Sequence, residues 1–247
     1  MMIQQRIALI TGGMGGIGTA ICKTLADSGC IIATTYSKPG KEIQWLSDMK
    51  EQGYTIHAYQ CDVTNYESCT AVVKQIIQKF DKIDVLVNNA GITKDSVFKK
   101  MNKTDWDSVI RTNLDSLFNM TKPVIDCMIE HKFGRIISIS SINGQKGQFG
   151  QVNYSAAKAG MHGFTMSLAQ EVAKKGITVN TISPGYIATD MVLSIDDSIR
   201  QKIIDQIPVG RLGKPEEIAH LVSYLASEHA GFITGADYAI NGGQHMM

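Results

Sequence analysis

The sequence lacks the features of membrane-spanning, secreted and nucleic-acid-binding proteins. No apolar run reaches the roughly 18 residues that a transmembrane helix needs, and residues 1–6 do not have the architecture of a signal peptide. Positive and negative charges nearly cancel, at 24 Lys and Arg against 23 Asp and Glu, and there is no long basic run. The sequence therefore predicts a cytoplasmic protein without a membrane or nucleic-acid partner.

Cysteine and proline are both scarce. The five cysteines are scattered, odd in number and free of Cys-x-x-Cys spacing, which argues against a disulfide framework and against a zinc site. We therefore expect no bound metal and a reducing compartment. Only five prolines occur, and there is no internal repeat or Pro/Gly-rich linker. We expect residues 1–247 to form one domain.

Short β-rich apolar segments alternate with longer segments of helical periodicity. The β-rich segments are residues 6–10, 30–36, 54–60, 83–88, 135–140, 177–182 and 237–240. Residues 64–80 illustrate the helices, since Thr64 and Glu67 have the spacing of a capping box and apolar residues recur at helical intervals. This alternation predicts an α/β fold with a doubly wound, parallel, seven-stranded sheet of the Rossmann type. Residues 183–215 form the longest stretch that we expect to be irregular, as a functional loop or lid.

A glycine cluster follows the first predicted strand and precedes the first predicted helix. Residues 11–18 read Thr-Gly-Gly-Met-Gly-Gly-Ile-Gly, so Gly12, Gly16 and Gly18 have Gly-x-x-x-Gly-x-Gly spacing. Glycines at this junction let the backbone approach a pyrophosphate, which the helix N-terminus then attracts. The cluster predicts a dinucleotide site, although a glycine-rich turn alone can also serve the backbone.

The end of the second predicted strand favours NADP(H) over NAD(H). An acidic residue there commonly accepts a hydrogen bond from the ribose 2′-hydroxyl, but no Asp or Glu follows Tyr36 before Glu42. Lys38 and Lys41 are present instead and would attract a 2′-phosphate. The alternative is that both lysines are solvated loop residues.

Three residues suggest acid–base chemistry. Tyr154 and Lys158 are four residues apart at the start of a helical pattern, which places them on one face of the helix. An ammonium group there is expected to lower the pKa of the phenol. Ser141 follows the fifth predicted strand, at the sheet edge where α/β folds bind ligands. The alternative for Tyr154 and Lys158 is two surface residues on one helix.

The order and spacing of these motifs resemble the short-chain dehydrogenase/reductase family over essentially the whole chain. The matching residues also include 61–63 (Cys-Asp-Val), 88–91 (Asn-Asn-Ala-Gly), Asn113 and 183–185 (Ser-Pro-Gly). The resemblance implies NADP(H) as cofactor, a homotetramer, and a catalytic set of Asn113, Ser141, Tyr154 and Lys158. It implies cofactor contacts at Gly12, Gly13, Met14, Gly16, Ile17, Gly18, Lys38, Lys41, Cys61, Asp62, Val63, Asn89, Ala90, Gly91, Tyr154, Lys158, Pro184, Gly185, Ile187 and Thr189. Asn113 would hold a water in a proton relay, unless its amide only bonds the backbone.

Within that family the sequence is similar to the acetoacetyl-CoA reductases of polyhydroxybutyrate synthesis. This implies reduction of acetoacetyl-CoA to (R)-3-hydroxybutyryl-CoA, with hydride from the nicotinamide and a proton from Tyr154. The acyl-CoA would contact Asp95, Lys100, Ser141, Gln148, Phe149, Gln151, Tyr154 and Tyr186. Lys100 is equally compatible with a loop residue that touches no substrate. The alternatives are a 3-oxoacyl-(acyl-carrier-protein) reductase and a non-catalytic NADP(H)-binding module.

Overall fold

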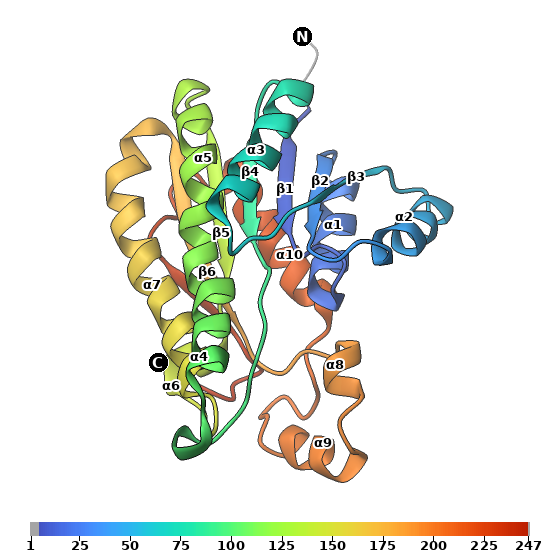
Figure 1. Ribbon diagram of the computed structural model, residues 1–247, viewed down its shortest axis with the longest axis vertical. Coiled ribbons are helices and arrows are strands. Elements are labelled where there is room, and N and C mark those ends of the chain that lie inside the picture. The colour runs from blue at the N-terminus through green and yellow to red at the C-terminus, as the bar shows by residue number, and fades with distance from the viewer. Residues whose placement is uncertain (1–4, 247) are drawn as a thin grey trace.

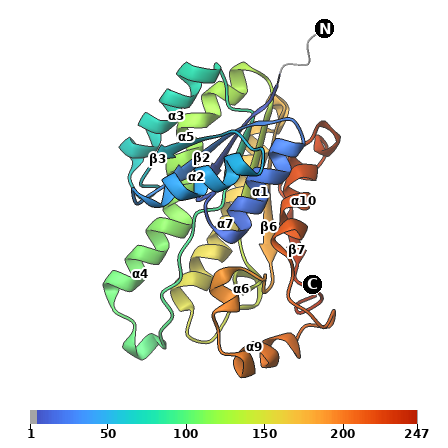
Figure 2. The same ribbon diagram turned by 90° about the vertical axis from the view of Figure 1, so that its right-hand side faces the viewer.

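A computed structural model describes residues 5–246, apart from the side chain of Met191, and contains one parallel sheet between two layers of helices (Figures 1 and 2). Its seven strands have the order β3-β2-β1-β4-β5-β6-β7. They are β1 (Ile7–Thr11), β2 (Ile31–Tyr36), β3 (Ile56–Gln60), β4 (Val85–Asn88), β5 (Gly134–Ile139), β6 (Ile177–Pro184) and β7 (Asp237–Ile240). The doubly wound fold class is therefore confirmed. The expected domain, 1–247, includes residues 1–4 and 247, which lie outside the described residues.

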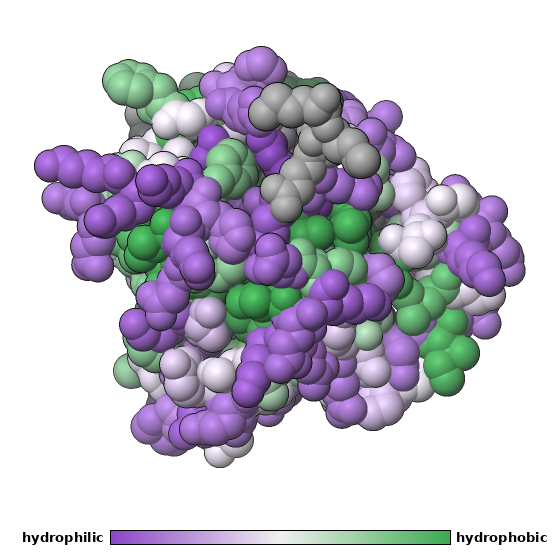
Figure 3. All heavy atoms as spheres, turned by 90° about the horizontal axis from the view of Figure 1, so that it is seen from above, coloured by the Kyte–Doolittle hydropathy of each residue, from purple (hydrophilic) through white to green (hydrophobic). Residues whose placement is uncertain are grey.

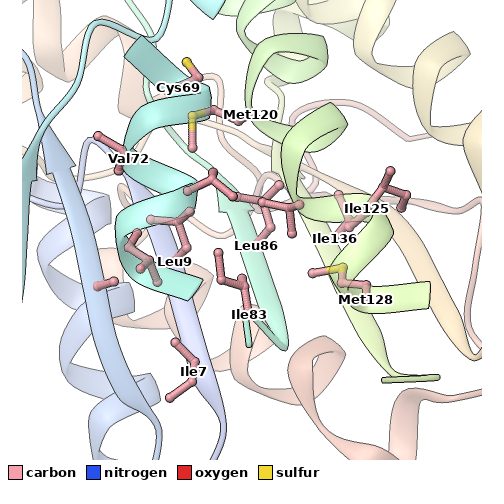
Figure 4. Packing of buried hydrophobic residues seen from close by; sticks show 14 of the residues in the cluster. Ile7, Leu9, Cys69, Val72, Ile83, Leu86, Met120, Ile125, Met128 and Ile136 are labelled. Atoms are coloured by element: carbon pink, nitrogen blue, oxygen red, sulfur yellow. The ribbon is translucent and has the colours of Figure 1, made fainter. Parts of the chain in front are cut away.

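Helices cover the sheet on both faces because its central strands are apolar on both sides. The longer ones are α1 (Gly16–Asp27), α2 (Lys41–Glu51), α3 (Tyr66–Phe80), α4 (Lys103–Ile110), α5 (Ser116–Glu130), α7 (Val152–Val172), α9 (Asp197–Ile204) and α10 (Pro215–Ala226). The shorter ones are η1 (Phe98–Lys100), η2 (Arg111–Asp115), α6 (Ile142–Lys146), η3 (Ala173–Lys175), α8 (Asp190–Leu193) and η4 (Glu228–Ala230). On one face α3, α5 and α7 bury Val72, Met120 and Val172, and Figure 4 shows the part of this core around Leu9 and Leu86. On the other face α1 and α10 pack together over the sheet.

The topology places the predicted motifs at one edge of the sheet. Strand order reverses between β1 and β4, and α/β folds bind ligands at such a switch point, beyond the carboxyl ends of the strands. In Figure 1 this edge lies at the bottom, beside α6, α8 and α9. The opposite edge, seen in Figure 3, is mainly hydrophilic with smaller hydrophobic areas between the polar residues.

The predicted start of α3 is wrong by two residues. The helix begins at Tyr66, and its cap is Asn65, whose side-chain oxygen accepts a hydrogen bond from the backbone N–H of Ser68 at 2.7 Å. Thr64 cannot serve as the cap because its hydroxyl and its backbone N–H both donate to Oδ1 of Asp62. An Asx-type turn has therefore displaced the expected capping box.

Residues 183–215 are less irregular than expected. They contain two short helices, α8 and α9, and the second is capped by Asp196, whose carboxylate accepts from the backbone N–H of Ser198. Apolar periodicity is too short here to predict either helix. Both lie below the sheet edge in Figure 1, where they border the predicted site.

Candidate functional site

Ser141 and Tyr154 meet beyond the end of β5. Ser141 lies two residues past the strand and caps α6, since its Oγ accepts from the backbone N–H of Asn143 at 3.1 Å. Tyr154 lies in the first turn of α7, and its hydroxyl is near enough to that of Ser141 for the serine to lower its pKa. A carbonyl oxygen placed between these two hydroxyl groups could accept a hydrogen bond from each.

The pKa of Tyr154 differs from our expectation. Burial raises it to about 12, although Ser141 acts in the opposite direction. The prediction that Lys158 lowers this pKa is wrong, because desolvation of the phenolate outweighs the other influences. Burial also lowers the pKa of Lys158 to about 7, so the cationic form of this amine is destabilised at the site.

Lys158 is held beneath the Tyr154 ring by the backbone of β5. Its Nζ donates to the carbonyl oxygen of Ile139 at 2.7 Å and lies 5.5 Å from the centroid of the Tyr154 ring. Gly91 borders both Lys158 and Asn113, since a Cβ on this glycine would lie 3.6 Å from Lys158 Nζ and 2.6 Å from Asn113 Oδ1. A side chain at residue 91 would collide with Asn113, so the glycine lets Asn113 and Lys158 approach the same stretch of backbone.

Asn113 lies in η2, a π-helix inserted between α4 and α5. Its amide donates to the carbonyl oxygens of Ile92 and Val109, both at 2.9 Å, and accepts from the backbone N–H of Ile92 at 3.3 Å. The π-helical turn accompanies the bond to Val109, four residues earlier, and π-bulges recur at functional sites. The amide thus fastens the segment after β4 to this helix.

The glycine-rich loop fits a dinucleotide pyrophosphate. Gly12 adopts a left-handed φ of 64°, and a Cβ on Gly18 would lie 2.4 Å from the carbonyl oxygen of Gly12. No side chain among the described residues caps α1, so its first N–H groups face the sheet edge. Thr189 lies over this loop, with its methyl group 2.9 Å from where a Cβ of Gly16 would be. Side chains at Gly16 or Gly18 would fill this cradle, so their absence leaves room for a phosphate group.

The other predicted cofactor residues surround this cradle. Asn89 donates to the carbonyl oxygens of Thr11 and Gly12 at 3.0 Å, and Ala90 donates through its N–H to the hydroxyl of Thr11. Asp62 is exposed at the sheet edge, where an adenine would be reached, and Val63 is buried beside it. Cys61 points elsewhere, because its thiol is buried against Cys69 at 3.8 Å.

The segment after β6 borders open space. A cavity of about 200 Å³ is lined by Gly185, Tyr186 and Ile187, together with residues of the α9–α10 connection and the C-terminal segment. Ile187 forms a β-bridge with Gly213, which fixes the backbone of this segment at that point. Lys38 and Lys41 are exposed at the far end of the site, beyond β2.

The structure brings together only some of the predicted substrate residues. Gln151 donates to Asp95 at 2.7 Å and accepts from Asn143 at 2.9 Å. Burial and then Asp95 raise the pKa of Tyr186, so this tyrosine belongs to the same group. In contrast Lys100, Gln148 and Phe149 are exposed, and the Phe149 ring is 86% accessible.

Several polar residues of this site were absent from the sequence prediction. Asn143 holds Gln151, while His162, Gln145 and Asp237 form a further group behind Ser141 and Lys158. A signal was available for His162, which follows Lys158 by four residues and so shares its helical face. Asp237 comes from a strand about eighty residues away, and only the sheet order brings it here.

The comparisons with known proteins agree with this geometry. A family model described as short chain dehydrogenase matches residues 6–200. The acetoacetyl-CoA reductase of Cupriavidus necator is 56% identical over 98% of this chain and 99% of its own length. Nodulation protein G of Azospirillum brasilense is 55% identical over 98% of both chains. A 3-oxoacyl-(acyl-carrier-protein) reductase of Vibrio cholerae is 44% identical over the full length of both. The chain belongs to the short-chain dehydrogenase family.

Proposed function

We propose that this protein reduces acetoacetyl-CoA to (R)-3-hydroxybutyryl-CoA with NADPH, as a step of polyhydroxybutyrate synthesis. The observation that carries the proposal is the neighbouring hydroxyl groups of Ser141 and Tyr154, with a buried Lys158 beside the tyrosine ring. The substrate is inferred from the similar acetoacetyl-CoA reductase of Cupriavidus necator, which is more similar than the carrier-protein reductase of Vibrio cholerae. An intact set of acid–base groups argues against a non-catalytic binding module.

The raised pKa of Tyr154 suits a reductase. A phenol with a pKa of about 12 remains protonated at neutral pH and can donate its proton to a developing alkoxide. Ser141 would donate a hydrogen bond to the same oxygen, and Asn113 and Lys158 would return a proton to Tyr154. NADPH, when bound along Gly12–Gly18, supplies the hydride. The cofactor would also contact Met14 and Ile17 of this loop, Pro184 beyond it, and the hydroxyl and amine of Tyr154 and Lys158.

The preference for NADPH rests on charge at the end of β2. Lys38 and Lys41 are exposed there and free to reach a 2′-phosphate. The nearest carboxylate, that of Glu42, accepts a hydrogen bond from the backbone N–H of Gly40, and burial and then this carboxylate raise the pKa of Tyr36. The carboxylate is therefore tied into the turn that starts α2, rather than extended toward a ribose hydroxyl.

A homotetramer in the cytoplasm completes the proposal. Large apolar side chains are exposed on helices that pack on the sheet, among them Phe118 on α5 at 56% and Met166 on α7 at 53%. Phe232 and Tyr224 are also exposed, at 102% and 50%. Apolar areas of this kind suit burial between subunits.

The five free thiols suit a reducing compartment. In the described residues no helix has the length and hydropathy to cross a membrane.

A substrate panel tests the reaction. Purified enzyme is assayed with NADPH and 3-oxoacyl thioesters of four to eight carbons, each on coenzyme A and on acyl carrier protein. The highest kcat/KM is expected for acetoacetyl-CoA. A maximum on medium-chain carrier-protein thioesters would instead favour the carrier-protein reductase, and turnover of no carbonyl would favour the binding module.

A further inference from the structure

One carboxylate behind the catalytic residues accepts hydrogen bonds from two segments of the site and lies beside a third. Asp237, the first residue of β7, accepts from the hydroxyl of Ser183 at 2.8 and 3.0 Å and from the amide of Gln145 at 2.7 Å. Nε2 of His162 lies 3.4 Å from the same carboxylate. The side chains of His162 and Asp237 are 20% and 18% exposed, so solvent competes little for these bonds.

Each partner of Asp237 adjoins a residue or element of the catalytic centre. Gln145 lies on α6, the helix that Ser141 caps. Ser183 immediately precedes Pro184 and the segment predicted to cover the cofactor. His162 lies one helical turn beyond Lys158 on α7. The carboxylate thereby connects three segments: α6, which Ser141 caps, the turn of α7 after Lys158, and the segment that begins at Pro184.

A second path leads from His162 to the backbone of Lys158. Nε2 of His162 lies 3.1 Å from the hydroxyl of Ser140, and that hydroxyl donates to the carbonyl oxygen of Lys158 at 2.9 Å. Ser140 is buried and directly precedes Ser141. The histidine therefore lies beside the Asp237 carboxylate and is hydrogen-bonded to Ser140, whose hydroxyl in turn bonds the turn of α7 that holds Lys158.

We propose that Asp237 and His162 are positioning residues that set the distance between Ser141 and the Tyr154–Lys158 face of α7. Neither touches the reacting atoms. The inference rests on the proposed function only in assuming that these three residues perform proton transfer. Small errors in such a geometry are costly, because an ångström of misplacement can reduce turnover by about a hundredfold.

The structure offers a control for a purely structural role. Thr165 and Thr181 join α7 to β6, two of the elements around Asp237, through a buried bond between their hydroxyls at 2.6 Å. Thr165→Val removes this bond with little change of shape, and the bond does not lead to Ser141 or Lys158. It should lower stability without altering the chemistry of the folded fraction.

The experiment compares Asp237→Asn, His162→Leu, His162→Gln and Thr165→Val with the wild type. The measurements are the single-turnover rate of NADPH oxidation, KM, the Kd for NADPH by fluorescence, and the melting temperature. Asp237→Asn is nearly isosteric, but the NH₂ group of the new amide would face the hydrogen-bond donors of Ser183 and Gln145. We expect it and His162→Leu to slow the single turnover by about tenfold or more, with KM and Kd changed by less than about twofold. His162→Gln restores an N–H donor and should recover most of the rate.

Three results would overturn the proposal. The first is a single-turnover rate, per folded enzyme, that stays within about fivefold of the wild type in Asp237→Asn and His162→Leu. The second is an equal loss of rate in Thr165→Val, and the third is no recovery of rate in His162→Gln. Wild-type failure on acetoacetyl-CoA refutes only the proposed substrate, and the variants are then compared on whichever carbonyl the wild type reduces.

Discussion

The residues proposed for catalysis and the exposed residues around the proposed substrate site have opposite surroundings. Asn113, Ser141 and Lys158 are at most 9% exposed, and their polar side-chain atoms bond to the backbone. Phe149 is 86% exposed, and Leu193 and Ile199 of α8 and α9 are about half exposed, at 49% and 52%. The fold itself thus determines the positions of the acid–base groups. The exposed side chains, such as that of Phe149, would gain packing partners only from a ligand or a neighbouring subunit, and we expect them to influence substrate choice.

The sharpest test of the buried side of this comparison is Tyr154→Phe. This change removes the donor hydroxyl while keeping the ring, so turnover should fall by at least about a hundredfold, the usual scale for loss of a general acid. The affinity for NADPH, measured by fluorescence titration, should change little. Near-normal turnover in the variant would refute the assignment of Tyr154.

Burial of Lys158 should also change how the free energy of unfolding varies with pH. Its pKa is lowered from the usual 10.5 to about 7, so between these values the unfolded chain binds a proton that the native one has released. Stability therefore rises with pH across this window, by about 1 kcal/mol per pH unit from this group. Below pH 7 both states are protonated, and the contribution becomes constant.

Lys158→Met isolates that contribution. The free energy of unfolding, from urea titrations at pH 6, 7, 8 and 9, should diverge from that of the wild type above pH 7, with the wild type gaining relative to the variant. Other groups titrate alike in both proteins and cancel in the difference. Parallel curves from pH 7 to 9 would show that the amine keeps its ordinary pKa.

The same contrast explains what the sequence could and could not predict. Apolar strands and helical periodicity are local patterns, and they identified all seven strands to within one or two residues. Tyr154 and Lys158 share one helix, so their spacing alone predicted their common face. The hub at Asp237 joins residues from β6, β7, α6 and α7, and nothing in their spacing along the chain brings them together. The predicted direction of the Tyr154 pKa shift was wrong, because the burial that raises this pKa depends on how the whole site packs.

On the exposed side, cofactor choice should depend on Lys38 and Lys41. We expect kcat/KM for NADPH to exceed that for NADH by at least about tenfold, equivalent to roughly 1.4 kcal/mol. The double variant Lys38→Ala with Lys41→Ala should lose most of this preference, through a higher KM for NADPH alone. Lys23→Ala, which removes a surface lysine bonded to Gln52, serves as the control. An unchanged preference in the double variant, or a wild type that favours NADH, would contradict the assignment.

The smallest expected effect concerns Phe149. Its ring is exposed, yet its backbone is fixed, because Ser96 donates to the carbonyl oxygen of Gly150 at 2.8 Å and Gln151 bonds to Asp95. The backbone around residue 149 is therefore held just before α7 and Tyr154, where the ring would limit the length of an acyl chain. Acetoacetyl-CoA should be preferred to the eight-carbon homologue, and Phe149→Ala should narrow this ratio of kcat/KM by about fivefold, since each methylene has a limited effect in an apolar pocket. Val152→Ala trims a neighbouring exposed side chain and should leave the ratio unchanged. If both variants shift the ratio equally, the selectivity belongs to the loop as a whole, and the ring has no specific role in it.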